Sequence, residues 1–340
     1  MNYISGRRTF LRRVVFGYFG AFTLNWGKKS HGATKPFSVG VCAHLWSASP
    51  QELDKTFAAL SRSTFKFVRW DLPWKSVEVT KGVLVMPDRF DDIVNRINSL
   101  GMSSIIILDY GNSFYDNGDK PISFEAVQAF VRYVKFVASH FKSKIDYYEI
   151  WNEWDTRNGG TSYTSVERYL DIIRLSSDVI HEVDPKNKVL AGSFSAFTLN
   201  RFNDNPSMDN YMRKFINSDV GIYIDIISVH PYVRGGSVEN ILLRTNSFLK
   251  NIKNWFDYGD FSKKPIMITE FGWRTAGNDL DVVSQEGQNI LIKNTLRIAR
   301  EQGYLAACLY ELKDSGHDED YGIYSENWER KKSSSAFDVI

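Results

Sequence analysis

The sequence predicts a single (β/α)₈ barrel, in which eight parallel strands alternate with eight helices. Eight short apolar runs rich in β-branched and aromatic residues recur along residues 36–340, and segments with a helical period separate them. Most of the runs are almost continuously apolar, which favours parallel strands covered on both faces. No linker rich in Pro, Gly or Ser interrupts this range, so we expect it to form one domain.

The eight predicted strands leave room for a helix between each consecutive pair. They cover residues 37–43, 65–70, 104–110, 147–151, 188–191, 224–230, 265–269 and 305–312. The fifth unit is the least regular, because a short strand precedes the polar segment 200–210. Eight such units in about 300 residues fit the usual size of one closed barrel, which is about 250 residues or more.

The intervening segments carry the signals of amphipathic helices. In the first, Ser49 can cap the helix, Pro50 takes the first helical position, and Glu52 can reach back to the cap. A later segment places apolar or small residues on one face at helical spacing. These residues are Val166, Leu170, Ile173, Ser177 and Ile180.

A doubly wound open sheet is the alternative arrangement of strands and helices. Such a sheet usually carries a glycine-rich phosphate-binding turn after its first strand. Here the first predicted strand is followed by His44, Leu45 and Trp46, without a glycine-rich turn. The sequence therefore favours the closed barrel.

Composition excludes several classes of protein. Hydrophobic residues make up 43 % of the chain and charged residues 24 %, the balance of an ordinary globular protein. The formal charge of +2 gives no reason to expect a nucleic-acid partner. Two cysteines, Cys42 and Cys308, exclude a disulfide framework and a cysteine-rich zinc site. They fall on the first and last predicted strands, which are neighbours in a closed barrel, and we expect buried free thiols rather than a disulfide.

Residues 1–35 form a separate N-terminal segment. They hold seven basic residues and no acidic ones, so the rest of the chain is net acidic. A basic stretch ending at Arg13 precedes an uncharged stretch, residues 14–27, which is too short to span a membrane comfortably. This order is typical of an export signal, and the run from Gly6 to Leu11 resembles the bacterial twin-arginine signal. We expect export to the periplasm or beyond, with 1–35 either cleaved or kept as a membrane tether; an amphipathic tail is the alternative.

Polar and aromatic residues stand where the predicted strands end. In a barrel, these carboxyl ends meet at one mouth, where active sites lie. The candidate binding or supporting residues at this mouth are His44, Trp46, Arg69, Asp109, Asn112, Asn152, Trp154, His230, Tyr232, Trp273 and Glu311.

Two glutamates, Glu153 and Glu270, directly follow the fourth and seventh predicted strands. Two carboxyl groups that face one cleft suit glycoside hydrolysis, because one protonates the leaving oxygen and the other attacks the anomeric carbon or activates water. A separation of about 5–5.5 Å leads to retention of configuration, and about 6.5–9.5 Å leads to inversion. An ordinary salt bridge to a nearby Arg or Lys is the alternative role for each glutamate.

Two motifs resemble the signatures of clan A glycoside hydrolases. The run Ile150-Trp151-Asn152-Glu153-Trp154 is similar to the Asn-Glu pair that ends the fourth strand in that clan. The second run, from Ile268 to Trp273, is similar to the segment around its second glutamate on the seventh strand. Within the clan, the chain looks most like family 39, in particular the bacterial glycosidases that act on secreted exopolysaccharide, and family 5 is the nearest rival. The resemblance covers essentially all of residues 36–340.

The resemblance implies a retaining mechanism without a cofactor or metal. Glu270 would be the nucleophile and Glu153 the general acid and base. Arg69 would keep Glu270 ionised and Tyr232 would donate a hydrogen bond to it. Asn152 would bind the sugar 2-hydroxyl. His230 would either shape the nucleophile's surroundings or be a buried histidine with satisfied hydrogen bonds.

Aromatic residues at the predicted loops could stack on sugar rings, because the flat faces of sugars are apolar. The candidates are Trp46, Trp74, Tyr115, Trp154 and Trp273, and filling the core is the alternative role for each. The polar loop 112–120 is a candidate cleft wall. The expected partner is therefore a carbohydrate, an oligosaccharide or a polysaccharide.

Two other classes of function stay open. The first is a metal-dependent barrel enzyme, such as an isomerase or phosphoesterase, with ligands drawn from the acidic and histidine residues at the mouth. No closely spaced pair of histidines supports it. The second is a sugar-binding barrel without catalysis, which the presence of both glutamates argues against.

Overall fold

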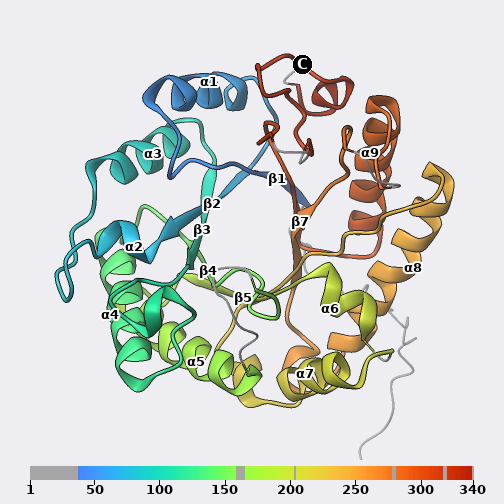
Figure 1. The fold of residues 1–340 in the computed structure, drawn as a ribbon. Helices are drawn as coiled ribbons and strands as arrows, with labels where there is room; N and C mark the ends of the chain where they lie inside the picture. Colours follow the sequence, from blue (N-terminus) through green and yellow to red (C-terminus); the bar gives the residue numbers. More distant parts are fainter. Residues whose placement is uncertain (1–36, 158–164, 203, 278–280, 317–319, 339–340) are drawn as a thin grey trace, which may run out of the picture. The chain divides into compact units, whose positions relative to one another are not determined.

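The computed structural model describes residues 37–157, 165–202, 204–277, 281–316 and 320–338, and within them eight parallel strands close into a barrel in chain order (Figure 1). The predicted (β/α)₈ barrel is therefore confirmed. The strands are β1 (Ser38–Cys42), β2 (Phe67–Pro73), β3 (Ser103–Asp109), β4 (Tyr147–Ile150), β5 (Lys188–Phe194), β6 (Ile226–Val229), β7 (Ile266–Phe271) and β8 (Ala306–Leu309). All eight predicted strands are present, with ends that shift by a few residues.

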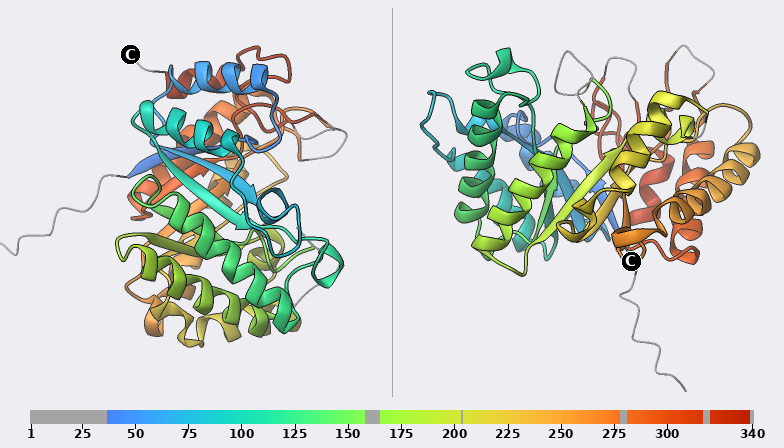
Figure 2. Two further views of the ribbon diagram at one scale, coloured as in Figure 1. Left: turned by 90° about the vertical axis from the view of Figure 1, so that its left-hand side faces the viewer. Right: turned by 90° about the horizontal axis from the view of Figure 1, so that it is seen from below.

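Helices surround the barrel along its length (Figure 2). They are α1 (Pro50–Leu60), α2 (Trp74–Val77), α3 (Asp88–Ser99), α4 (Phe124–His140), α5 (Val166–Val183), α6 (Ala196–Arg201), α7 (Pro206–Ile216), α8 (Val238–Phe256) and α9 (Gln285–Glu301). Short 3₁₀ helices lie at Asp116–Gly118, Asp219–Ile222, Gly259–Phe261 and Lys332–Phe337. The polar segment of the fifth unit contains the end of α6 and the start of α7.

The barrel closes through the pairing of β1 with β8, where Ser38 lies opposite Ala306. Side chains fill the barrel interior below the mouth, and Ile105, Leu190 and Met267 belong to this inner cluster. Cys42 and Cys308 belong to it as well, and both are buried free thiols. A second and larger cluster lies between the strands and the helices. Because side chains fill the interior, the polar side chains of the site lie at the mouth of the barrel.

The start of α1 matches the predicted cap in part. Ser49 Oγ accepts a hydrogen bond from the Glu52 backbone nitrogen at 3.2 Å, and Pro50 is the first helical residue. The Glu52 side chain does not reach back to the cap as predicted. It instead accepts hydrogen bonds from Trp328 Nε1 at 2.9 Å and Lys313 Nζ at 3.2 Å, because the segment after β8 packs beside α1.

The end of β7 is held tightly against β8. The register between the two strands shifts between Ile268 and Phe271, so the ladder is irregular beside Glu270. A Cβ atom at Gly272 would lie 2.0 Å from the carbonyl oxygen of Tyr310, so only glycine fits there. This close approach fixes where the chain leaves β7 and hence where Glu270 is held.

The predicted N-terminal segment, residues 1–35, lies outside the described residues, and its role as a signal or tether stays a prediction. Within the part of the chain that the structure describes, no helix is both long enough and apolar enough to cross a membrane.

Candidate active site

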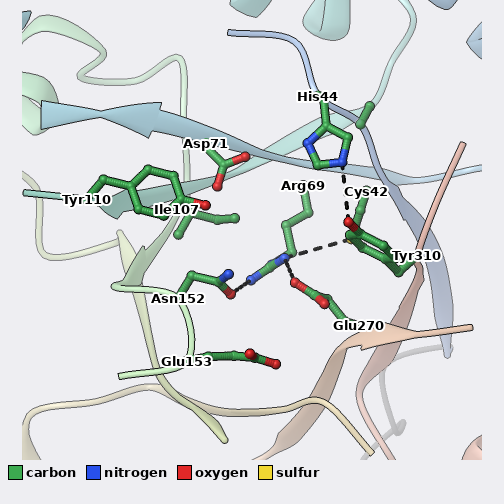
Figure 3. A pocket seen from close by; sticks show the side chains of 11 residues that line it. Cys42, His44, Arg69, Asp71, Ile107, Tyr110, Asn152, Glu153, Glu270 and Tyr310 are labelled. Carbon is green, nitrogen blue, oxygen red and sulfur yellow. Dashed lines mark hydrogen bonds and ion pairs between the residues drawn. The ribbon is translucent and has the colours of Figure 1, made fainter. Parts of the chain in front are cut away.

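Arg69, on β2, lies at the centre of a buried network at the mouth of the barrel (Figure 3). Its Nε donates to Glu149 Oε2 at 2.6 Å, and its Nη1 donates to Glu270 Oε1 at 2.7 Å. Its Nη2 donates to Asn152 Oδ1 at 3.0 Å. One guanidinium therefore fixes side chains from β4, from β7 and from the segment that follows β4.

Glu149, on β4, is part of this network and was missed from the sequence. It is fully buried, and Ser193 Oγ donates to its Oε1 at 2.6 Å. Burial alone would raise the pKa of Glu149, but the charges of Arg69 and His230 lower it below its usual value. The missed signal was a charged residue inside an apolar strand, because a buried carboxylate needs a cationic partner.

Glu270, the last but one residue of β7, is held as a carboxylate. Besides the contact with Arg69, its Oε2 accepts a hydrogen bond from the Tyr232 hydroxyl at 2.8 Å. Burial would raise the pKa of Glu270, but the charges of His230 and Arg69 and the Tyr232 hydrogen bond together lower it. The predicted contacts of Arg69 and Tyr232 with Glu270 are both present.

Glu153 follows β4 in an unusual backbone conformation. Its φ is 47°, and that of Trp151 is 64°, both in the left-handed region that residues other than glycine rarely adopt. Such backbone strain often occurs at functional sites. The turn places the Glu153 side chain, which is 15 % exposed, at the surface of the central cavity.

His230 connects the two glutamates. It follows β6 and is fully buried, with its Nδ1 at 2.9 Å from Glu153 Oε1 and 3.7 Å from Glu270 Oε2. Its Nε2 lies 3.1 Å from Thr269 Oγ1. Burial would lower the pKa of His230, but the charge of Glu270 and the hydrogen bond with Glu153 raise it. Of the two roles considered for His230, these contacts favour shaping the surroundings of the glutamates.

One oxygen of Glu153 and one of Glu270 lie within 4.8 Å of each other. Both side chains line a cavity of about 260 Å³ at the barrel mouth, where Figure 3 shows Arg69 reaching Asn152 and Glu270. The other side chains labelled there are Cys42, His44, Asp71, Ile107, Tyr110 and Tyr310. Asp71 and Tyr310 stood at predicted strand ends but were not assigned a role.

His44 and Glu311 form a pair at the edge of this cavity. His44 Nε2 lies 2.9 Å from Glu311 Oε2, and Glu311 is buried whereas the His44 side chain is 44 % exposed. Burial would lower the pKa of His44, but the hydrogen bond and the charge of Glu311 raise it to about 9. Both residues were predicted at the mouth, and His44 lines the central cavity.

Asp109, predicted as a binding or supporting residue, is buried at the end of β3 and does not line the central cavity. Burial raises the pKa of Asp109 well above its usual value, and the charge of Asp71 raises it further. Asp71, which lines the cavity, also has a pKa raised by burial. Asp109 and Asp71 interact with each other, so the buried Asp109 adjoins the cavity through Asp71.

Two of the predicted sugar-binding tryptophans are core residues. Trp154 is fully buried and stacks on Tyr169 with the ring centres 5.3 Å apart, within the usual range of about 4.5–7 Å for aromatic pairs. Trp273 is 3 % exposed, and its Nε1 donates to the Val233 carbonyl oxygen at 2.8 Å. Trp154 packs against α5, and both rings are buried outside the central cavity, where removal from water stabilises them.

The other aromatic candidates and Asn112 also lie outside the central cavity. Trp74 and Tyr115 are buried and stack on each other. Trp46 is half-buried against the core, with Lys75 Nζ 5.1 Å from its ring centre. Asn112 is buried, and its Nδ2 donates to the Glu78 carbonyl oxygen at 2.8 Å. Of the two roles predicted for Asn112, binding or supporting, this contact favours a supporting one in the loop after β3.

At this site Arg69 would compete with a metal ion for the Glu270 carboxylate. One ligand atom each from Glu153, His230 and Glu270 lies within 4.8 Å of the others, so the three could hold a cation. However, the Arg69 guanidinium is already 2.7 Å from Glu270, and Tyr232 donates to the other oxygen of that carboxylate. The positive charge of Arg69 opposes a divalent ion, and the donor set therefore fits carboxylate chemistry better.

The comparison with protein families agrees with this geometry. The family model of the cellulases, glycosyl hydrolase family 5, matches residues 30–314. The match covers most of the chain, which therefore belongs to glycosyl hydrolase family 5. The predicted membership of clan A is confirmed, and family 5 is the family named beside family 39 from the sequence. No curated protein matches the chain.

Solved structures of low sequence identity share the fold. A family 39 glycoside hydrolase from Bacteroides cellulosilyticus WH2 superposes with a TM-score of 0.70 at 18 % identity, over 89 % of this chain and 63 % of that one. The exo-β-1,4-mannosidase Op5Man5 from Opitutaceae bacterium strain TAV5 gives 0.67 at 15 %, over 88 % and 58 %. The family 39 enzyme from Xanthomonas axonopodis pv. citri gives 0.65 at 13 %, over 89 % and 65 %. This chain thus spans less than two thirds of each of these proteins.

Proposed function

We propose that the protein is a retaining glycoside hydrolase, with Glu270 as nucleophile and Glu153 as general acid and base. The observation that carries the proposal is the approach of the two carboxylates, whose nearest oxygens lie within 4.8 Å. Retaining enzymes place their carboxyl groups about 5–5.5 Å apart, whereas inverting enzymes need about 6.5–9.5 Å to admit a water molecule. The closeness of Glu153 to Glu270 supports direct attack on the sugar.

In the first step, Glu270 attacks the anomeric carbon while Glu153 protonates the glycosidic oxygen. The bond between that carbon and oxygen breaks, the leaving group departs as an alcohol, and a glycosyl ester forms on Glu270. The lowered pKa of Glu270 suits a nucleophile, because the group must be ionised to react. The charges of His230 and Arg69 and the hydrogen bond from Tyr232 supply this lowering, with Arg69 at 2.7 Å and Tyr232 at 2.8 Å from the carboxylate oxygens.

In the second step, Glu153 accepts a proton from water, the water oxygen attacks the anomeric carbon, and the Glu270 carboxylate leaves. His230 positions Glu153 through the 2.9 Å contact with its Oε1. The hydrogen bond from Arg69 to Asn152 Oδ1 fixes the amide group, so that its nitrogen can donate to the sugar 2-hydroxyl. Such a contact strengthens as positive charge develops on the sugar ring in the transition state.

The setting that we propose for this activity is outside the cytoplasm. The basic and then uncharged segment 1–35 supports export, either as a cleaved signal or as a membrane tether. An exported glycosidase meets polysaccharides or oligosaccharides, and secreted exopolysaccharide is the substrate class that we infer. No cofactor enters either chemical step.

The stereochemical outcome of hydrolysis tests the proposal. Proton NMR of a freshly mixed reaction, with aryl glycosides and exopolysaccharides as substrates, identifies the anomer that forms first. We expect the configuration of the substrate to be retained before mutarotation mixes the anomers. Initial formation of the opposite anomer would contradict the assignment of Glu270 as nucleophile.

A further inference from the structure

A second cavity opens on the other side of Glu153. Its volume is about 610 Å³, compared with about 260 Å³ for the central cavity, and Glu153 is the one residue that lines both. The central cavity is lined from the β1, β2, β3 and β8 side, together with Glu270. The second cavity, which we call the aglycone groove, is lined by residues 195–201 around α6 and by the segment that follows β6 (Figure 1).

The position of the groove beside Glu153 indicates which part of the substrate it binds. The general acid must contact the leaving oxygen, so the departing part of the substrate lies beside Glu153. The sugar that is transferred lies against Glu270, which lines the central cavity but not the groove. This step rests on the proposed function, and it places the leaving-group side of the substrate in the aglycone groove.

Three exposed arginines line the groove: Arg201, Arg234 and Arg244. Among the described residues, none of the three forms an ion pair, and the negative charges on the groove wall are Glu153 at one end and Asp281. The groove is therefore a concentration of positive charge on a chain whose residues beyond 1–35 are net acidic. The three arginines outnumber the two carboxylates, so the groove wall is net positive and attracts ligands of negative charge.

The guanidinium groups of these arginines are held in place by neighbouring groups. Arg201 lies over the ring of Phe197, with 4.0 Å from its Cζ to the ring centre. Arg234 lies over the ring of Tyr232 at 5.2 Å. Arg244 Nη2 donates to the carbonyl oxygen of Arg234 at 2.9 Å. Preorganised guanidinium groups lose less side-chain entropy when they bind, and their planar fork suits a carboxylate or a sulfate group.

We propose that the aglycone groove binds a sugar that carries an anionic group, a carboxylate or a sulfate ester, on the leaving-group side of the scissile bond. The substrate is then an acidic polysaccharide or oligosaccharide. Phe197, which is 40 % exposed, adds an apolar surface beside the charges. Such a surface suits the flat face of a sugar ring.

Binding of paired polymers to the Glu270→Gln variant tests this inference, because the substitution stops turnover and lies outside the groove. The carboxylate arm uses hyaluronan, alginate and polygalacturonate, each beside its carboxyl-reduced form, and the sulfate arm uses dextran sulfate beside dextran. We expect at least one acidic polymer to bind about tenfold or more tighter than its neutral counterpart, and this preference to fall as salt is raised. The arm that shows the preference identifies the anionic group.

Charge variants in the same background separate the groove from general electrostatics. Adding Arg201→Gln and Arg234→Gln should weaken binding of the preferred polymer about tenfold or more. The matched control is Arg62→Gln with Lys66→Gln, which removes two positive charges from the exposed segment between α1 and β2 and should leave binding unchanged. Thermal unfolding of each variant checks that it is folded.

Equal affinity for every acidic polymer and its neutral counterpart would overturn the inference. So would unchanged binding in the Arg201→Gln, Arg234→Gln variant. Because binding is measured without turnover, the proposed function fails separately. A wild-type protein that prefers acidic polymers in binding but hydrolyses nothing would contradict the glycosidase mechanism alone. Hydrolysis of both members of a pair at equal kcat/KM would contradict the preference of the groove for anionic sugars alone.

Discussion

The Nη1 atom of Arg69 lies 2.7 Å from Oε1 of Glu270, and both side chains are almost completely buried. The same guanidinium donates to Glu149, so one buried cation is hydrogen-bonded to two buried carboxylates. Charges taken out of water cost free energy unless they are paired and hydrogen-bonded. The network therefore couples the stability of the barrel mouth to the ionisation of the candidate nucleophile.

Removing one of these buried charges should destabilise the fold. Glu149→Gln removes the charged acceptor of Arg69 Nε and Ser193 Oγ while Glu270 still balances the charge of Arg69, and we expect the free energy of unfolding to fall by about 1–3 kcal/mol. Urea denaturation followed by circular dichroism measures the loss. The control is Glu182→Gln, which removes an exposed glutamate paired with Lys135 and should cost less than about 1 kcal/mol. A loss of that small size in Glu149→Gln would show that the buried pair is not needed for stability.

The two candidate catalytic glutamates should respond differently to the leaving group. Glu270→Gln removes the nucleophile, and we expect kcat to fall by about 10³-fold or more on every substrate. Glu153→Gln removes the acid, so its loss should be greatest for alkyl leaving groups and smaller for nitrophenolates, which depart without protonation. Steady-state kinetics on a leaving-group series measures this. Near-wild-type turnover in either variant would refute the role of that glutamate, and Glu182→Gln should behave as wild type.

Loss of the Tyr232 hydroxyl should shift the acidic limb of the pH profile. The hydrogen bond from Tyr232 lowers the pKa of Glu270, so Tyr232→Phe raises that pKa, and Glu270 then becomes protonated at a higher pH. We expect the acidic limb of kcat/KM, which reports the free enzyme, to move to higher pH. The control is Tyr304→Phe, whose hydroxyl donates to the Leu249 carbonyl oxygen far from the mouth. An unmoved limb, or one at lower pH, would rule out this role.

Chelation should leave activity unchanged. The contacts of Glu270 with Arg69 and Tyr232 occupy both carboxylate oxygens without a metal. Prolonged dialysis against EDTA, followed by kinetic assay and metal analysis, tests this expectation. Loss of activity that a divalent metal restores would favour the metal-dependent class of enzyme instead.

The sequence predicted the strands and the candidate catalytic carboxylates because each signal is local. An apolar run followed by Asn152 and Glu153, or by Glu270, shows both the strand and the side chain that leaves its end. Parallel strands in a barrel then bring these ends together whatever their distance along the chain. Arg69 and Tyr232 were found in the same way.

The local sequence pattern did not predict the direction in which each side chain points. Trp154 and Trp273 follow strand ends like the glutamates, but both are buried outside the central cavity. Trp154, for example, stacks on Tyr169 of α5. Glu149 was missed because it was taken as part of an apolar strand. The three arginines of the aglycone groove come from α6, from the segment after β6 and from α8, so only the folded chain brings them together.

The most direct test of the proposed mechanism is to trap the glycosyl enzyme. Wild-type protein and Glu270→Gln are incubated with a panel of activated 2-fluoro-glycosides and examined by intact-mass spectrometry, with peptide mapping of any adduct. We predict that one sugar adds its glycosyl mass to the wild type at Glu270 and that Glu270→Gln stays unlabelled. An adduct on a residue other than Glu270 in an active enzyme, or equal labelling of Glu270→Gln, would contradict the assignment of the nucleophile.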